Sequence, residues 1–151
     1  MKRRDALTNS AAVLGMLMAA GLLPQAAHAA YNKPAFDAKT VAEVLKALGA
    51  SAPAESKDVT LTAPDIAENG AVVPLGAATT LPNVKQMLVL VEKNPNTLVA
   101  SFAINDAVDA NFLTRAKLGQ SSDVYAVAIT NDGKAFYAKK EVKVTLGGCG
   151  G

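Results

Sequence analysis

Residues 84–92, which read VKQMLVLVE, decide the fold of this chain. Residues 87–91 are all apolar, and the turn sequence Asn94-Pro95-Asn96 follows shortly after them. A short apolar run that ends near a turn is typical of a strand that is buried on both faces. We therefore expect this stretch to form the central strand of a β-sheet.

Strand-like segments lie on both sides of this run. Before it, Val59 and Leu61 alternate with threonines, and a short segment at residues 71–75 contains Pro74, which favours an edge strand or a bulge. After it, Asn131-Asp132-Gly133 is typical of a tight turn. The other expected strands are residues 97–104, 112–118, 123–130 and 134–146. About seven short strands separated by Gly, Pro or Asn predict a mostly β protein, an immunoglobulin-like antiparallel β-sandwich.

One helix is expected before the strands. Asp37 is a suitable N-cap, and Gly49 is a natural stop. Between them, apolar residues recur at helical spacing at positions 41, 44, 45 and 48. The pattern predicts an amphipathic helix over residues 38–48, which follows a short lead-in at residues 30–36.

The N-terminal residues have the composition of an export signal. Lys2-Arg3-Arg4 is a basic segment, residues 11–23 are apolar but too short to span a bilayer, and Ala27-His28-Ala29 is a small-x-small cleavage site. We expect residues 1–29 to be cleaved and the mature protein to be periplasmic, without a membrane anchor. The adjacent arginines favour a twin-arginine signal, although Ala6 stands where a bulky aromatic residue is usual. An ordinary secretory signal is the alternative.

Cleavage would change the charge and the chemistry of the chain. Lys2, Arg3, Arg4 and Asp5 would leave, so 15 basic and 13 acidic residues become 12 of each. A neutral chain gives no argument for nucleic acid binding. The only histidine, His28, would leave as well, and Cys149 is the only cysteine. The mature chain alone therefore cannot build a His-dependent catalytic site, a His/Cys metal site or an internal disulfide. We expect no enzyme, no catalytic residues, no metal and no cofactor.

The C-terminal sequence Gly147-Gly148-Cys149-Gly150-Gly151 places this cysteine among four glycines. Because glycine lacks a side chain, such a run is not expected to form a helix, a strand or a core. The expected domain organisation is an export signal at 1–29, a sandwich domain at 30–146 and a flexible arm at 147–151. An exposed thiol in an oxidising compartment is easily oxidised, so its presence favours a functional role for Cys149. The glycines would let the arm enter a narrow channel of another protein, because they have no side chains that could clash. A frayed end with an accidental cysteine is the alternative.

The surroundings of Cys149 in the sequence do not activate its thiol. No histidine is available, the nearest basic residue is Lys143, and the carboxylate of Gly151 is two residues away. A nearby negative charge disfavours the thiolate, so a partner would have to activate it. This behaviour is expected of a carrier or a substrate rather than of a catalyst.

Three rival interpretations can be weighed from the sequence. A thiol oxidoreductase usually has a Cys-x-x-Cys motif, which is absent. A structural or interaction sandwich could use Cys149 for an intermolecular disulfide between chains, and this alternative stays open. A calcium site at Asn105, Asp106, Asp109 and Asn111 is disfavoured, because their spacing matches no EF-hand loop.

The chain resembles the SoxY family in its C-terminal Gly-Gly-Cys-Gly-Gly motif, combined with the Arg3-Arg4 signal, the single helix and the strands. SoxY is the sulfur-carrier subunit of the Sox thiosulfate-oxidising system. The resemblance implies that Cys149 holds the sulfur cargo and that Gly147, Gly148, Gly150 and Gly151 form the swinging arm. It implies pairing with SoxZ, a small β-sandwich subunit, in a heterodimer or a larger complex. It also implies that a haem enzyme loads thiosulfate, a hydrolase releases sulfate, and in some organisms a molybdenum enzyme oxidises the remaining sulfur.

Overall fold

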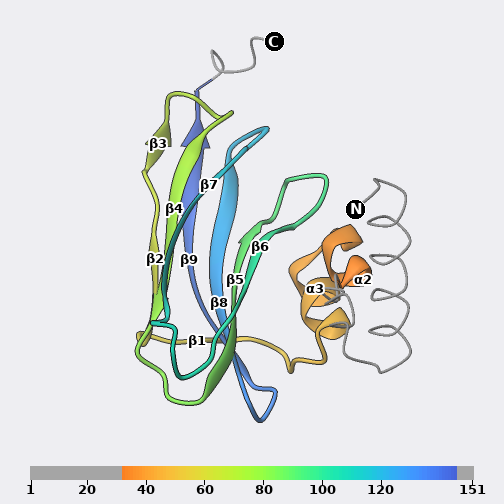
Figure 1. The fold of residues 1–151 in the computed structure, drawn as a ribbon. Helices are drawn as coiled ribbons and strands as arrows, with labels where there is room; N and C mark the ends of the chain where they lie inside the picture. The colour runs from red at the N-terminus through yellow and green to blue at the C-terminus, as the bar shows by residue number, and fades with distance from the viewer. Residues whose placement is uncertain (1–31, 146–151) are drawn as a thin grey trace, which may run out of the picture. The chain divides into compact units, whose positions relative to one another are not determined.

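The computed structural model describes residues 32–145. Residues 1–31, which include the expected export signal, and residues 146–151 lie outside this part. Within residues 32–145, two short helices precede nine strands (Figure 1). The elements are α2 (Lys33–Asp37), α3 (Val41–Ala47), β1 (Ala54–Glu55), β2 (Val59–Thr62), β3 (Ile66–Ala67), β4 (Val73–Thr79), β5 (Val84–Val91), β6 (Leu98–Ala103), β7 (Asn111–Ala116), β8 (Ser122–Thr130) and β9 (Ala135–Val144).

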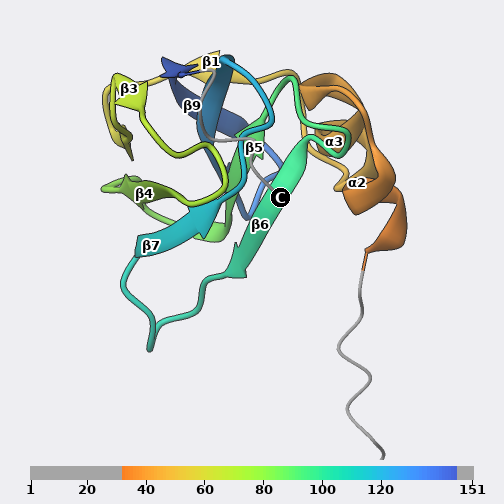
Figure 2. The same cartoon turned by 90° about the horizontal axis from the view of Figure 1, so that it is seen from above.

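The strands form two sheets that pack face to face (Figures 1 and 2). The larger sheet has the order β1-β9-β8-β5-β6, with β3 also paired to β9, and the smaller sheet has the order β2-β4-β7. All pairs are antiparallel except those of β1 and β3 with β9. The expected β-sandwich is confirmed. The described residues hold more strands than the expected seven. The additional strands β1 and β3 are only two residues long, which is too short to show an alternation of apolar and polar residues in the sequence.

Strand β5 is an interior strand of the larger sheet, as its apolar run predicts. It lies between β8 and β6, and the side chains of residues 87–91 are fully buried. Met87, Val89 and Val91 face the core between the sheets, whereas Leu88 and Leu90 face the helices. Burying an aliphatic side chain of this size contributes about 1.5–3 kcal/mol. A strand buried on both faces therefore anchors both layers.

The helices cover the outer face of the larger sheet (Figure 1). The expected helix at 38–48 is shorter in the structure, where α3 begins at Val41. Thr40 rather than Asp37 is its N-cap: the Thr40 hydroxyl accepts from the Glu43 N–H, and Glu43 accepts from the Thr40 N–H. The expected lead-in contains α2, which Asn32 caps. Gly49 follows α3 with a φ of 68°, so the expected stop is confirmed.

Strand β2 leaves the smaller sheet at Thr62, and this departure explains Pro74. The pairing of β2 with β4 runs from Val59↔Thr79 to Thr62↔Gly76 and then ends. The chain continues to β3, which pairs with β9 of the other sheet. Pro74 was expected at an edge or a bulge, yet β4 is the middle strand of its sheet and pairs with β7 in regular register. It is tolerated because it lies beyond the end of β2, where no strand needs its N–H.

Candidate functional site

The residues that the sequence singles out lie outside the described part of the chain. Cys149, Gly147, Gly148, Gly150 and Gly151 all follow Thr145, the last described residue. Their roles therefore remain predictions from the sequence. The structure shows how the end of β9, which leads to them, is held.

Hydrogen bonds on both sides hold the end of β9. On one side the Val144 N–H donates to Ser121 Oγ at 2.9 Å. On the other side the Thr145 N–H donates to the Ala67 carbonyl oxygen at 3.2 Å, and its hydroxyl donates to the Glu68 carbonyl oxygen at 3.1 Å. The bonds of Thr145 extend the β3–β9 pairing to the last described residue, and the bond to Ser121 holds the opposite side of β9 next to the start of β8. The segment that carries Cys149 therefore starts from a fixed point.

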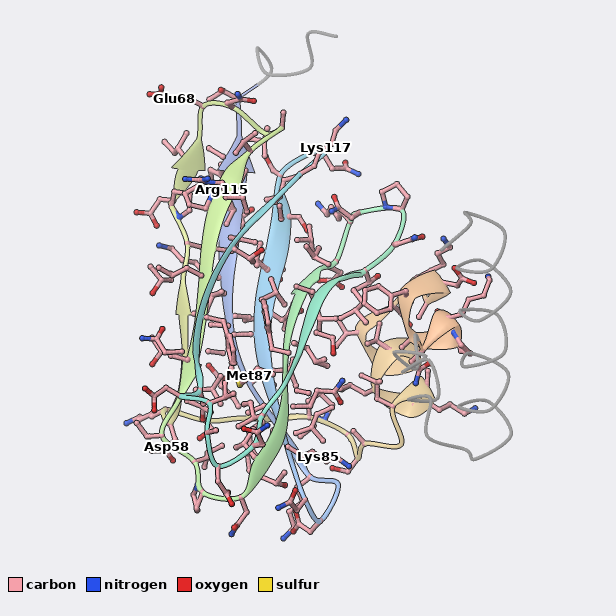
Figure 3. The ribbon with its side chains drawn as sticks, viewed as in Figure 1. Asp58, Glu68, Lys85, Met87, Arg115 and Lys117 are labelled. Atoms are coloured by element: carbon pink, nitrogen blue, oxygen red, sulfur yellow. The ribbon has the colours of Figure 1, made fainter. Side chains whose placement is uncertain are left out.

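Gly70 allows the loops at this end to pack against β9. A Cβ atom at Gly70 would lie 2.6 Å from the Leu118 carbonyl oxygen and 2.8 Å from Val144 Cγ1. The Leu118 N–H also donates to the Gly70 carbonyl oxygen at 2.7 Å. Figure 3 labels Glu68, Arg115 and Lys117 around this end of the sandwich. The start of β4, the end of β7 and the end of β9 thus meet at one place.

The lysines of β9 point to opposite faces, as the alternation of a strand requires. Lys139 lies on the outer face, where its Nζ is 3.3 Å from Asp123 Oδ2, and that hydrogen bond raises the pKa of Lys139. On the same face the Tyr125 hydroxyl donates to Glu92 Oε2 at 3.2 Å; partial burial and then the Glu92 charge raise the pKa of Tyr125. Lys140 turns to the other side, toward the smaller sheet. Lys139 Nζ also lies 5.9 Å from the centroid of the Tyr125 ring, so the residues of the outer face form one local cluster, which Lys140 does not join.

The structure gives no support for a cation site at residues 105–111. Asn105 Oδ1 accepts from the Ala107 N–H at 3.0 Å, which makes it part of a turn. No cluster of three or more His, Cys, Asp or Glu residues suited to a metal occurs between residues 32 and 145. In the same stretch, no helix is both long enough and apolar enough to cross a membrane.

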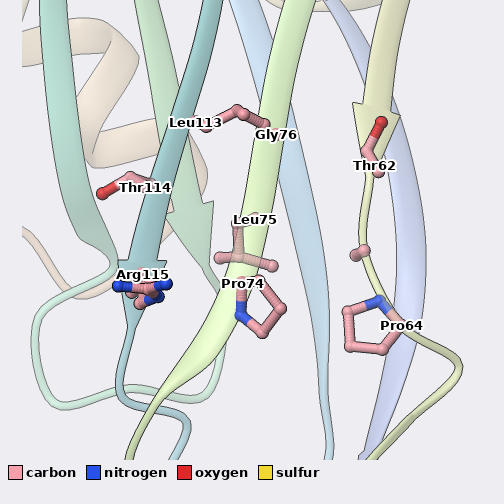
Figure 4. Close-up of a pocket in the computed structure, with 9 residues that line it drawn as sticks. Thr62, Pro64, Pro74, Leu75, Gly76, Leu113, Thr114 and Arg115 are labelled. Atoms are coloured by element: carbon pink, nitrogen blue, oxygen red, sulfur yellow. The ribbon is translucent and has the colours of Figure 1, made fainter.

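A groove on the outer face of the smaller sheet was not found from the sequence. It has a volume of about 810 Å³ and is bordered by three short segments, residues 62–64, 74–76 and 113–115 (Figure 4). The available signals were the Pro74 and Gly76 pair inside a strand-like segment and Leu113 on the outward side of β7. These signals do not predict a groove by themselves, because the groove depends on where β2 leaves the sheet.

The family model described as "Sulfur oxidation protein SoxY" matches residues 44–149 of this chain. The chain belongs to the SoxY family. The SoxY match extends from α3, through all nine described strands, to Cys149 itself. The SoxY resemblance seen in the terminal motif is thereby confirmed over most of the sequence.

A solved SoxY structure agrees with this assignment. The chain is similar to the sulfur carrier protein SoxY from Chlorobium limicola f thiosulfatophilum, with a TM-score of 0.61 and 30% identity over 68% of this chain and 93% of that one. Two superoxide reductases share the fold at lower identity. The neelaredoxin of Ignicoccus hospitalis has a TM-score of 0.51 with 18% identity over 58% of this chain and 80% of its own. The putative superoxide reductase of Thermotoga maritima has 0.51 with 14% identity over 61% and 86%. No curated protein sequence matches the chain.

Membership of the SoxY family gives the chain a role as a sulfur carrier in sulfur oxidation, within the Sox system. The similarity to superoxide reductases concerns the fold alone.

Proposed function

We propose that this chain carries sulfur intermediates covalently on the thiol of Cys149 during periplasmic thiosulfate oxidation. The observation that carries the proposal is the family match, which ends at Cys149, the only cysteine of the chain. The firmly held end of β9 supports it, because a swinging arm needs a rigid base from which to reach several partners.

The proposed cycle uses the cysteine as an attachment point and leaves catalysis to other proteins. In loading, the Cys149 sulfur forms a disulfide bond with the outer sulfur of thiosulfate; a haem enzyme accepts the two electrons, and water takes the thiol proton. In release, a hydrolase directs water to the sulfonate sulfur and the sulfur–sulfur bond to it breaks. Sulfate and its protons leave, and a persulfide stays on Cys149. A molybdenum enzyme would oxidise that persulfide sulfur in organisms that contain one.

The partner, the compartment and the arm belong to the same proposal. A SoxZ-type small β-sandwich subunit would pair with this chain, and residues 1–29 would direct export before removal. Residues 147–151 would form the arm, with glycines at 147, 148, 150 and 151 so that it can enter narrow active-site channels. The cysteine would stay unreactive until a partner supplies the positive charge that favours its thiolate.

The decisive experiment is the mass of the C-terminal peptide from cells grown on thiosulfate. Lys143 is the last lysine, so trypsin releases residues 144–151, which contain Cys149. We expect this peptide to carry thiosulfate-derived, persulfide or sulfonate adducts on Cys149, and to lose them in cells grown without reduced sulfur. The digest should be made without reducing agent, because reduction would remove the adducts.

The alternative function, an exported interaction sandwich whose Cys149 forms a disulfide between chains, predicts a different peptide. It would appear only as the disulfide-linked dimer of residues 144–151, whatever the sulfur source. That result, or a free thiol alone on thiosulfate, would rule out the carrier function.

A further inference from the structure

The groove on the smaller sheet exists because one strand changes sheets. Beyond Thr62 the chain leaves β4 and runs through Ala63 and Pro64 toward β3. Lys140 holds this departing segment: its Nζ donates to the Ala63 carbonyl oxygen at 2.7 Å and is 2.9 Å from Asp65 Oδ1. The gap between this segment and β4 is therefore a fixed feature of the fold.

Gly76 forms the floor of the groove. A Cβ atom at this position would lie 3.0 Å from Leu113 Cδ2 and 3.1 Å from Thr62 Cβ. A glycine in the middle of a strand weakens the strand, and where no bulge is present it often marks a place where another chain or ligand approaches closely. The register of β4 with both neighbours is regular at Gly76. The missing side chain therefore makes room for the Leu113 and Thr62 side chains and leaves the outer surface hollow between them.

The face around this floor is apolar and uncovered. Leu113 is 84% exposed, although it lies in the middle of a regular strand. Val72, which precedes β4, is 53% exposed, and Pro74 is also exposed beside the groove. Both described helices pack on the other sheet, so nothing among residues 32–145 covers this face (Figure 1). A contiguous apolar face of this kind marks an interaction site more often than a free surface.

Arg115 adds a positive charge to the edge of this apolar face. It lies beside Pro74 at the rim of the groove (Figure 4), and it is exposed. Among the described residues, no carboxylate or carbonyl group pairs with its guanidinium, whereas nearby Lys140 has two partners. It is also the only arginine outside the expected signal. A guanidinium beside an apolar surface is well suited to bind a carboxylate of a protein partner in a bidentate manner.

The face lies close to the base of the cysteine-bearing segment. Gly70 connects the two: it lies against Val144 near the end of β9, and also against Leu118, which follows shortly after Arg115 in the chain. A protein bound on this face would therefore stand beside the point where the chain leaves β9.

We propose that the outer face of β2, β4 and β7 is the docking surface for the second subunit of the carrier complex. That subunit would place an apolar side chain against Gly76 and Leu113, and a carboxylate on Arg115. This inference rests on the proposed function, because it assigns the surface for the partner named there. The occupant is a protein because the groove is open along the sheet, and Leu113 projects from it as a knob.

The test measures the affinity of the purified full mature chain for its SoxZ-type subunit by titration calorimetry. We expect Leu113→Asp to raise Kd about 30-fold or more, which is the effect of removing an interface hot spot. Arg115→Glu is expected to raise Kd about tenfold or more by reversing a charge at the interface. Gly76→Ala, which fills the floor of the groove, should weaken binding as well. Because Leu113 and Arg115 are exposed, both variants should keep the melting temperature of the wild type.

Matched controls place the same changes elsewhere on the surface. Val108→Asp introduces the same charge at another exposed apolar residue, and Lys57→Glu reverses a charge beyond the far end of β2. Both should leave Kd within about twofold of the wild type, as is usual outside an interface.

Several results would overturn the inference. Wild-type affinity in Leu113→Asp and Arg115→Glu would place the subunit elsewhere. If the wild-type chain did not bind the SoxZ-type subunit at all, that subunit would not be the partner of this face. If the chain associated with itself and Leu113→Asp abolished this, the occupant would be a second copy of this chain. The Cys149 adduct is measured separately by mass, so none of these results decides the carrier function.

Discussion

Lys140 of β9 donates a hydrogen bond of 2.7 Å to the carbonyl oxygen of Ala63, a residue 77 positions earlier in the chain. Ala63 belongs to the segment that has just left the smaller sheet, and β9 is the strand that leads to Cys149. One side chain thus joins the wall of the groove to the base of the arm. The Asp65 carboxylate, at 2.9 Å from the same Nζ, is 87% exposed and contributes less.

Replacing Lys140 tests this connection. Lys140→Met should lower the free energy of unfolding by about 1 kcal/mol, because it leaves the partly buried Ala63 carbonyl without its donor. Asp65→Asn is the matched control: it removes only the exposed ion pair and should cost less than about 0.5 kcal/mol. Urea unfolding followed by circular dichroism measures both values. An equal loss in the two variants would mean that the ion pair, not the bond to Ala63, holds the segment.

The close approach at Gly70 leads to a second prediction. Gly70→Ala should destabilise the fold by about 1–3 kcal/mol, because its Cβ would lie 2.6 Å from the backbone oxygen of Leu118, which cannot move aside as a flexible side chain could. Gly119→Ala is the control, since no atom lies within 4 Å of its Cβ position. It should be neutral or stabilise by up to about 1 kcal/mol through the unfolded state. Similar melting temperatures for the two variants would contradict the packing described at the end of β9.

The sequence predicts the strands well because their signals are local. The run at 87–91 indicates a strand buried on both faces, and the structure places it inside the larger sheet, between β8 and β6, with both faces covered. Asn131-Asp132-Gly133 indicates a tight turn, and Gly133 has a φ of 82° between β8 and β9. In both cases the pattern lies in the same residues that form the strand or the turn, so the prediction does not depend on contacts with distant parts of the chain.

The groove could not be predicted because distant residues create it. Pro74 indicates only that a strand partner is missing; which partner is missing depends on β2 leaving at Thr62 and on Lys140, far along the chain, holding Ala63. The start of α3 shows the same limit on a smaller scale. Asp37 and Thr40 are both good N-caps by residue type, and the Glu43 side chain decides for Thr40 by completing the capping box. Cys149 was identified from the sequence alone, since the described residues end before it.

A third prediction concerns acid stability. Lys134, and next the Thr130 hydroxyl, donate to the Asp132 carboxylate and lower the pKa of Asp132 from 3.8 to about 2. A carboxyl group whose pKa is lower in the folded state stabilises that state above pH 3.8, and this contribution is lost as the pH falls from 3.8 toward 2. Asp132→Asn should therefore be less stable than the wild type near neutral pH, with a difference that shrinks through this window. Urea unfolding at a series of pH values measures the difference; one that stays constant down to pH 2 would exclude this cause.

Cys149 itself gives the fourth prediction. Cys149→Ser should abolish sulfur loading while the melting temperature and the affinity for the partner subunit stay at wild-type values, because the proposed arm contributes nothing to the core. Loading is measured by the mass of residues 144–151 after incubation with thiosulfate and the loading enzyme. A large drop in melting temperature would mean that the cysteine packs against the domain, which would contradict a free arm.

The glycines around Cys149 give the last prediction, which distinguishes the entry of the arm into a partner's channel from the chemical reactivity of the thiol. If a partner channel admits the arm because it lacks side chains, a β-branched residue beside the cysteine should hinder entry without altering the thiol. Gly148→Val and Gly150→Val should then slow enzymatic loading and release, while the reaction of Cys149 with a small thiol reagent such as dithionitrobenzoate keeps its wild-type rate. Gly119→Ala, which lies outside the arm, should change neither rate. Wild-type turnover in both valine variants would refute the narrow channel, and an equally slowed reaction with the reagent would show that the glycines act on the thiol itself.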